Sequence, residues 1–470
     1  MALNGKATRT LFPEIGESLV ITGKLRPASP SSKLDRVCVW LAEQSSIAAA
    51  GFSPDRVTRL SDWTDCRYMS DRHDPTAAAA VAPPRIAAGL RQRAEPAEAR
   101  LSVADRIADW RNRMAASPGF QRWAGSFFLT RFIARRHARE LFDLCSGFVY
   151  SQVLYAGIQL NLFGKLRNGP LSMGEIAVAV GLPLEGTERL VHAASSLDLL
   201  EATQDGRWRL TVNGASIAPN TGLEKLIEHN QLLYRDLLDP VALLRDPRRS
   251  ETAIAAYFPY GEAGRPEDVD PVAAARYSDL MAATVPPLAE EVVDAYALDR
   301  HRKLLDVGGG IGAFLALMGE RAPKLDLMLF DLPAVAVHAR AQLAKNGLAD
   351  RTVVHAGNFQ TDALPVGADL ITLVRVLLDH GDEVALTILR RVREALEPGG
   401  TLLVVEPFSG IRGAERVGDA YFGLYLFAMG RGRARTIAQH QALLRAAGFS
   451  RTRIVPTRYA VQTGIIAAQA

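Results

Sequence analysis

The sequence predicts a doubly wound α/β domain in its C-terminal part, preceded by a mainly helical region. Three observations support this prediction. An apolar run at 304–307 leads straight into a glycine-rich turn at 308–312. A short apolar segment that ends in an acid, Asp331, follows the next helix-like stretch. Strand-like and helix-like segments then alternate to the end of the chain, as they do in parallel sheets with helices on both faces.

Composition bounds the class of protein. The chain has 470 residues, 48% of them hydrophobic, enough for about two to four domains with sizeable cores. The net charge of +4 is mild, so any attraction to nucleic acid or membranes must come from local clusters. No apolar run reaches the roughly 18 residues of a membrane span and the start lacks a signal-peptide pattern, so we expect a cytoplasmic protein. Cys38, Cys66 and Cys145 are too few and too scattered for a disulfide framework or a zinc cluster, and we expect no metal.

Residues 1–95 are rich in small residues, proline and serine, with an alanine run at 77–80 and Pro83-Pro84 behind it. Such a composition offers little apolar surface to bury, so we predict a disordered leader. A regulatory arm is the alternative interpretation.

Residues 101–140 are predicted to be helical, with arginines interleaved with aromatic side chains. This mixture is typical of helices that lie on an anionic bilayer, which would give a peripheral membrane contact. Alternatively, the aromatics pack onto the protein or a partner subunit while the arginines are solvated. The arginines are Arg106, Arg111, Arg113, Arg122, Arg131, Arg135, Arg136 and Arg139, and the aromatics are Trp110, Phe120, Trp123, Phe127, Phe128 and Phe132.

Residues 141–167 predict one long helix that is apolar on several faces and ends before Gly169-Pro170. We expect it to be buried, and we expect a homodimer formed through 141–200. The next segments have the outline of a winged helix: helices at 171–177 and 185–197 and a wing at 205–210. The second of these helices has one arginine and several acids, a poor face for phosphates, so we expect no nucleic-acid partner.

Two further helices, at 223–244 and 272–297, lead into the α/β part. They contain polar groups on largely apolar surfaces, which makes His229, Tyr277 and Met281 candidate pocket residues. His229 is alternatively a satisfied structural group.

The glycine turn is the main functional motif. A turn of this kind lets a ligand approach backbone N–H groups, and an acid such as Asp331 at the end of the next strand can bind a ribose diol, so we predict a nucleoside-bearing cofactor. The turn is preceded by the acid Asp306 and lacks the G-x-G-x-x-G spacing of dinucleotide enzymes. An acid there suits a cationic amino acid better than a pyrophosphate, which favours S-adenosylmethionine over NAD. An NAD-dependent dehydrogenase and a purely structural turn are the alternatives.

The predicted alternation continues after Asp331. Helices are expected at 334–346, 383–396 and 437–447, and strands at 325–330, 352–356, 368–374, 401–405, 451–456 and 459–465, the last with an antiparallel edge.

Several longer phrases resemble a known family. The glycine turn, Gly357-Asn358-Phe359, the stretch 394–400 and Glu406-Pro407 occur in the order found in small-molecule O-methyltransferases of the plant caffeate and isoflavone type. The phrases LFDLCSGFVYSQVL, YSDLMAA and GDAYFGLYLFAMGRGR are similar to those of the bacterial hydroxyneurosporene (demethylspheroidene) O-methyltransferases of carotenoid biosynthesis. The resemblance covers roughly residues 140–468.

The resemblance implies a winged-helix-like dimerisation domain at 96–270 and a Rossmann-like catalytic domain at 271–470 that holds S-adenosylmethionine. It also implies an acyclic hydroxycarotenoid as substrate and a photosynthetic bacterium as source. The resemblance places these residues at the cofactor: Asp306, Gly308, Gly310, Asp331, Leu332, Asn358, Phe359, Arg375, Tyr277 and Met281. The family usually has Asp at the position of Asn358.

One departure concerns catalysis. The plant enzymes have a general-base histidine immediately before an Asp, whereas here Leu378 precedes Asp379. The candidates for accepting the proton are therefore His380, Asp379 and His229. The alternative functions are a bacteriochlorophyllide C-methyltransferase, a phenolic O-methyltransferase and a ligand-responsive winged-helix regulator.

Overall fold

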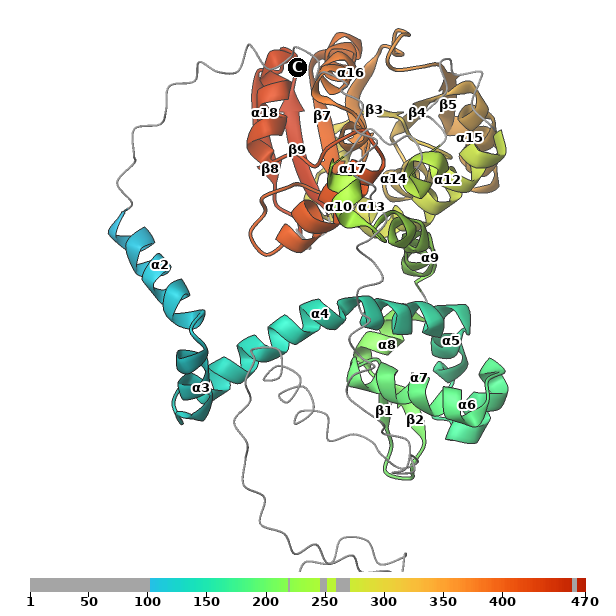
Figure 1. The fold of residues 1–470 in the computed structure, drawn as a ribbon. Helices are drawn as coiled ribbons and strands as arrows, with labels where there is room; N and C mark the ends of the chain where they lie inside the picture. Colours follow the sequence, from blue (N-terminus) through green and yellow to red (C-terminus); the bar gives the residue numbers. More distant parts are fainter. Residues whose placement is uncertain (1–101, 219, 246–251, 259–270, 459–462) are drawn as a thin grey trace, which may run out of the picture. The chain divides into compact units, whose positions relative to one another are not determined.

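The computed structural model describes residues 102–218, 220–245, 252–258, 271–458 and 463–470. The chain divides into two compact units, Met1–Arg106 and Ile107–Ala470. The elements described below belong to the second unit, except that the helix Val103–Ala115 begins in the first unit (Figure 1). The leader predicted for 1–95 lies outside the described residues, and the domain boundary predicted at 270 stays a prediction.

A mixed seven-stranded sheet with the order β5-β4-β3-β6-β7-β9-β8 forms the C-terminal part (Figure 1). The first five strands in this order run parallel, and β9 is antiparallel to both β7 and β8. This confirms the predicted α/β class with an antiparallel edge. The strands are β3 (Lys303–Val307), β4 (Asp326–Asp331), β5 (Thr352–Ala356), β6 (Ala368–Val374), β7 (Leu396–Glu406), β8 (Arg451–Val455) and β9 (Gly464–Gln469).

Helices cover both faces of this sheet because successive strand residues point to opposite sides. Leu305 and Val307 belong to one apolar cluster, and Leu304 belongs to the other. The first cluster is completed by α16 (Asp382–Ala395) and α18 (Ile437–Ala446), and the second by α13 (Pro286–Ala295), α14 (Ala313–Arg321) and α15 (Pro333–Lys345). The two cores hold the carboxyl ends of the parallel strands in one row, where the site lies.

The predicted final strand is partly wrong. Residues 459–462 lie outside the described residues, and β9 begins at Gly464 rather than at 459. Pairing along β7 sets its extent, since Gly464 lies opposite Glu406 and Gln469 opposite Thr401.

The winged-helix-like outline is confirmed in the helical region. Ser172 and Glu175 form a capping box that starts α6 (Met173–Val180), and α7 (Leu184–Ser196) follows. The strands β1 (Leu200–Ala202) and β2 (Trp208–Leu210) pair as the wing. The other elements here are α2 (Val103–Ala115), α3 (Pro118–Ser126), α4 (Arg131–Gln159), α5 (Leu162–Leu166) and α8 (Val212–Ile217).

The long buried helix predicted for 141–167 is wrong in two respects. The helix α4 spans Arg131–Gln159, and Asn161 then adopts a left-handed conformation that separates it from α5. Its apolar side chains are exposed in the single chain: Leu141 is 65% and Leu144 is 74% exposed. By length and composition alone, α4 is the one helix in the described part that is long and apolar enough to cross a membrane. An exposed apolar surface of this extent indicates that α4 contacts another molecule.

Prolines divide the two helices predicted at 223–244 and 272–297. The first is α9 (Thr221–Asp236) followed by α10 (Pro240–Arg245), and the second is α12 (Pro271–Thr284) followed by α13. Pro240 and Pro286 each begin a new helix because proline has no N–H to bond backwards. The elements α11 (Ala253–Tyr257), η6 (Leu377–Asp379), η7 (Arg416–Tyr421) and α17 (Phe422–Ala428) complete the surroundings of the site.

Candidate functional site

A cavity of about 370 Å³ lies at the carboxyl ends of β3, β4 and β6, with α12 on one side. In doubly wound sheets, ligands bind at this end of the strands. The predicted site residues that line the cavity are Asp306, Gly308, Gly310, Asp331, Leu332, Asn358, Phe359, Arg375, Tyr277, Met281, Asp379 and His380. His229 is the one predicted site residue that does not line it.

The glycine turn forms the floor of this cavity. Gly308, Gly310 and Gly312 have φ angles of 70°, 58° and 82°, a region that favours glycine. A Cβ added at Gly308 would lie 2.8 Å from the Val376 side chain, whereas a Cβ at Gly310 would meet nothing within 4 Å. The backbone at Gly310 therefore borders open space that a ligand can approach closely.

Asp331 closes the far side of the turn. Its Oδ2 accepts a hydrogen bond from the backbone N–H of Gly310 at 2.7 Å, and its Oδ1 accepts one from Leu332 N–H at 2.7 Å. Burial raises the pKa of Asp331 to about 6, although both backbone hydrogen bonds oppose the shift. The carboxylate is held rigidly where a second strand ends, a position from which it can bind two vicinal hydroxyls.

Asp306 lies at the end of β3 and is completely buried. Its Oδ1 accepts a hydrogen bond from Thr372 Oγ1 at 2.6 Å, while its Oδ2 has no hydrogen-bond partner. Burial raises the pKa of Asp306 to about 7, and the nearby Asp331 carboxylate raises it further. A buried acid with an unpartnered oxygen beside a cavity fits a cationic ligand. The residues present therefore fit the amino-acid end of S-adenosylmethionine better than a pyrophosphate.

Phe359 and Asn358 form another part of the wall. Asn358 Oδ1 accepts a hydrogen bond from Gln360 N–H at 2.9 Å, which fixes this loop. The Phe359 ring lies edge-on to the His380 ring with centroids 5.6 Å apart. A flat ligand such as a purine can pack on this aromatic surface.

Arg375 follows β6 in a left-handed conformation with φ of 53°. Its guanidinium donates to Thr284 Oγ1 at 2.8 Å and to the Met281 carbonyl at 2.9 Å, which ties α12 to the sheet. Burial lowers the pKa of Arg375, while Tyr277 and Asp379 act in the opposite direction. Arg375 thus brings a partly desolvated positive charge to the cavity wall.

Among the three candidate proton acceptors, Asp379 has the pKa that is shifted most from its ordinary value. Burial raises its pKa to about 7, and the carboxylate of Glu406 adds to the shift. Tyr277 donates a long hydrogen bond of 3.5 Å to Asp379 Oδ2. A carboxylate of this pKa is poised for proton transfer near neutral pH.

His380 also lines the cavity, but it is a weaker base. Burial lowers its pKa to about 4, and Arg431 and Arg435 lower it further. Its imidazole is therefore neutral at pH 7. With a pKa of about 4, it binds a proton more weakly than Asp379, whose pKa is about 7.

His229 is placed away from the cavity lining. Its Nε2 lies 2.9 Å from the Tyr425 hydroxyl, and burial lowers its pKa to about 4. It packs against Tyr257 at 4.6 Å between ring centroids. His229 is therefore not among the cavity-lining residues, its Nε2 is engaged by α17, and its catalytic role stays a prediction.

Within the described part of the chain, no group of three or more His, Cys, Asp and Glu side chains is arranged to hold a metal ion.

Leu378, which stands where the plant enzymes have their histidine, does not line the cavity. Its side chain is 4% exposed and packs in an apolar cluster with Leu243, Leu426 and Met429.

A mainly parallel sheet with a glycine cradle and two buried acids at the carboxyl ends of its strands is the arrangement of a methyltransferase of Rossmann-like fold. The comparisons with known proteins agree. Residues 142–216 match the O-methyltransferase dimerisation domain and residues 234–450 the O-methyltransferase domain.

Two relatives are demethylspheroidene O-methyltransferases. That of Cereibacter sphaeroides is 43% identical over 73% of this chain and 90% of its own length, and that of Rhodobacter capsulatus is 37% identical over 72% and 83%. Human N-acetylserotonin methyltransferase in complex with SAM has a similar structure, with a TM-score of 0.59 and 25% identity over 71% of this chain and 97% of that one.

The chain belongs to the S-adenosylmethionine-dependent O-methyltransferase family. It is an enzyme whose methyl donor is S-adenosylmethionine, and the dimerisation-domain match supports a homodimer. The exposed surface of α4 from residue 142 onward falls within that match. The individual roles of the cavity residues remain predictions.

Sequence reasoning missed several residues that hold the site together. Arg435, His440, Tyr421 and Tyr425 are buried or half-buried next to it. No local pattern marks them, because each is a polar residue on an otherwise ordinary apolar helix or loop.

Proposed function

We propose that this enzyme methylates the tertiary hydroxyl of an acyclic hydroxycarotenoid of the 1-hydroxyneurosporene or demethylspheroidene type, giving a methoxy carotenoid. The names of the two bacterial relatives support this substrate class. The observation that carries the chemistry is Asp379, a buried carboxylate with a pKa raised to about 7 in the same cavity as the glycine cradle.

A tertiary alcohol is a far weaker acid than a phenol, so its proton must pass to a protein group as the ether forms. Bound S-adenosylmethionine supplies an electrophilic methyl group. Among the three candidate bases, Asp379 has the highest affinity for a proton, since the pKa values of His380 and His229 are lowered to about 4. Asp379 therefore accepts the hydroxyl proton, and holding the acceptor oxygen close to the cradle supplies much of the remaining rate.

The apolar side of the cavity suits a polyene. Phe258, Met281, Val285 and Phe359 line it, and Phe258 also belongs to the apolar cluster that contains Leu378. A long hydrocarbon gains about 25 cal/mol for each Å² of apolar surface removed from water.

The test is incubation of the purified protein with methyl-labelled S-adenosylmethionine and a panel of acceptors. The panel contains 1-hydroxyneurosporene, demethylspheroidene, a catechol-type phenol and a bacteriochlorophyllide. We expect label in the methoxy carotenoid. Label on the phenol or on a ring carbon would assign the enzyme to one of the alternative methyltransferase activities instead.

We also propose that the protein is cytoplasmic and contacts the photosynthetic membrane peripherally through residues 103–139. This segment precedes the dimerisation-domain match. Its arginines are exposed, and Trp110 and Trp123 are 57% and 51% exposed. Arginines beside exposed indoles complement an anionic lipid surface, and a carotenoid substrate would be dissolved in the hydrocarbon interior beneath that surface.

Vesicle sedimentation tests this contact. The protein should bind vesicles of mixed neutral and anionic lipid and dissociate from them at high salt. It should not bind vesicles of neutral lipid alone. Each of Arg122→Gln and Arg131→Gln should weaken binding about fivefold, since one arginine near such a surface contributes about 1 kcal/mol. Arg189→Gln on α7, whose side chain is 79% exposed, is the control and should bind as the wild type does. Equal binding by all variants would reject the contact. Light scattering on the purified protein without vesicles measures whether it is a dimer.

A further inference from the structure

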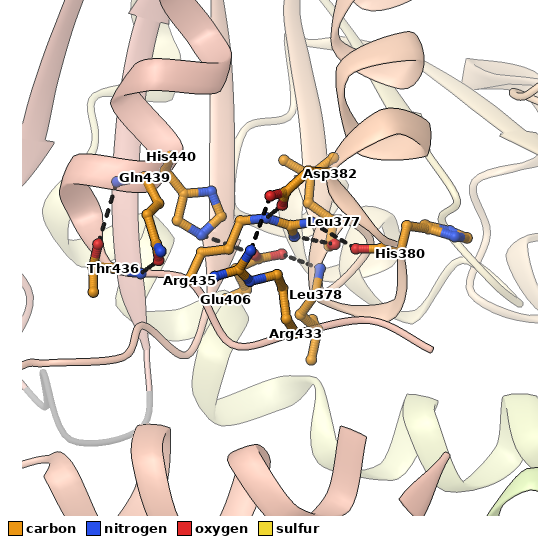
Figure 2. Close-up of polar contacts among 10 residues, drawn as sticks. All are labelled: Leu377, Leu378, His380, Asp382, Glu406, Arg433, Arg435, Thr436, Gln439 and His440. Carbon is orange, nitrogen blue, oxygen red and sulfur yellow. Dashed lines mark hydrogen bonds and ion pairs between the residues drawn. The ribbon is translucent and has the colours of Figure 1, made fainter. Parts of the chain in front are cut away.

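The segment 377–382 brings Asp379 and His380 to the cavity, yet residues outside the cavity lining hold its backbone (Figure 2). The segment leaves β6 as the short helix η6 and enters α16 at Asp382. Several of its backbone groups form hydrogen bonds with the loop 432–435 and with the end of β7. The side chains found there are Arg435, Glu406 and His440.

Arg435 is completely buried and binds the segment at three points. Its Nη1 donates to the Leu377 carbonyl and its Nη2 to the His380 carbonyl, both at 2.6 Å. Its Nε donates to Asp382 Oδ1 at 2.9 Å. The planar guanidinium thus bridges the backbone of Leu377 and His380, as Figure 2 shows, a geometry that an ammonium group cannot reproduce.

Glu406 holds the same segment from the other side. It ends β7 with no exposed surface, and its Oε2 accepts a hydrogen bond from Leu378 N–H at 3.2 Å. Its Oε1 lies 3.1 Å from Nε2 of the buried His440, although the two atoms are not aligned as a hydrogen bond. His440 is fixed by α18, which starts with a capping box of Thr436 and Gln439 (Figure 2).

The loop itself runs against the segment. Arg433 N–H donates to the Leu378 carbonyl at 2.9 Å. Gly432 has φ of 75°, and a Cβ there would lie 2.2 Å from the same carbonyl. The backbone around Asp379 is therefore bonded at Leu377, Leu378 and His380, which leaves the Asp379 carboxylate little freedom of direction.

We propose that Arg435 and Glu406 are positioning residues for methyl transfer: by holding the backbone of 377–380 they orient the Asp379 carboxylate toward the acceptor hydroxyl. The proposal rests on the proposed role of Asp379 as the proton acceptor. Neither residue lines the cavity, so both act through Asp379 rather than on the substrate.

The first test compares Arg435→Lys with Arg433→Lys. The lysine at 435 keeps the charge but loses the fork that reaches both carbonyls. We expect kcat to fall about tenfold or more, because a small misplacement of a catalytic group is costly. The KM for S-adenosylmethionine and the affinity for S-adenosylhomocysteine should change less than about twofold, because the cradle is untouched. Arg433 binds the same Asp382 at 2.9 Å but is 48% exposed, so Arg433→Lys should keep the wild-type kcat.

The second test uses Glu406→Gln, which keeps an oxygen for Leu378 N–H and removes the charge that raises the pKa of Asp379. The acid limb of the kcat profile should move to lower pH than in the wild type. Loss of structure alone would lower kcat without moving this limb. Asp379 interacts, through charge or a hydrogen bond, with four charged or titratable groups. They are Tyr277 on α12, Arg375 after β6, Glu406 on β7 and Tyr425 on α17.

Folded Arg435→Lys with wild-type kcat would overturn the proposal, and a Glu406→Gln limb at the wild-type pH would overturn the electrostatic coupling of Glu406 to Asp379. If Arg435→Lys does not fold, the kcat of Glu406→Ala is compared with that of Glu406→Gln, because only the glutamine keeps an acceptor for Leu378 N–H. Equal kcat values would overturn the positioning. A wild-type protein that methylates a different acceptor overturns the proposed substrate but not the positioning, which is then measured with that acceptor.

Discussion

Replacing Asp379 by Asn should lower kcat with the hydroxycarotenoid by about 100-fold or more, the usual contribution of a general base. The amide has nearly the same shape but cannot accept the proton. The pH profile gives an independent check. The base must be ionised to act, and burial raises the pKa of Asp379 from 3.8 to about 7. Turnover of the wild type should therefore rise with pH through about 7, and this limb should be absent from Asp379→Asn.

His380→Gln and His229→Gln are the matched controls for Asp379→Asn. Both histidines are weaker bases than Asp379, because burial lowers the pKa of each to about 4. We expect both variants to keep most of the activity. Binding of S-adenosylhomocysteine should be unchanged in all three variants. If Asp379→Asn turns over as fast as the wild type while a trideuteromethyl donor shows that chemistry is rate-limiting, Asp379 is not the base and the proton leaves to water.

Replacing Asp331 by Ala should weaken S-adenosylhomocysteine binding roughly ten- to a hundredfold. Losing a buried charge-assisted hydrogen bond costs about 1.5–3 kcal/mol. The variant also removes the acceptor that holds the Gly310 and Leu332 N–H groups, so the cradle itself loosens. Calorimetric titration gives the affinity, and the melting temperature with and without ligand gives a second measure.

Asp331→Asn separates these two effects, because its side-chain oxygen can still accept one of the two backbone hydrogen bonds. We expect an affinity between those of the wild type and Asp331→Ala. The melting temperature without ligand shows whether the fold has suffered. An unchanged titration in a folded Asp331→Ala protein would remove this acid from the cofactor site.

Much of the sheet and the cofactor cradle could be predicted from sequence. The apolar run before Gly308 and the acid at Asp331 are local patterns, and a strand or a glycine turn is specified mainly by neighbours in the chain. The bounds of β5 and β6 agree with the prediction to the residue. The departure at Leu378 is also visible in the sequence, and it correctly raised the question of which group takes the proton.

The helical region was less predictable because its apolar surfaces do not say what covers them. The periodicity of α4 indicates an apolar helix on several faces, but burial depends on a second molecule that lies outside the single chain. The prolines at 240 and 286, which begin α10 and α13, are visible in the sequence, and their local effect on the backbone could have been used to divide the two predicted helices.

The sequence by itself determined the succession of strands and helices along the chain, the glycine cradle, and the acids at the two ends of the cradle. These features depend on backbone conformation and side-chain alternation, which are local properties. Only the tertiary structure distinguishes the environments of the candidate bases, and our proposal of Asp379 rests on that difference. Tyr277 is 102 residues from Asp379 in sequence, and Glu406 meets the backbone of Leu378 from 28 residues away. Burial and the charge of Glu406 raise the pKa of Asp379, whereas the hydrogen bond from Tyr277 opposes the shift. Burial and the charges of Arg431 and Arg435 lower the pKa of His380, and His229 lies against Tyr425 rather than in the cavity lining. The reason is that the energy of a charge depends on everything packed around it, and packing is a property of the folded chain.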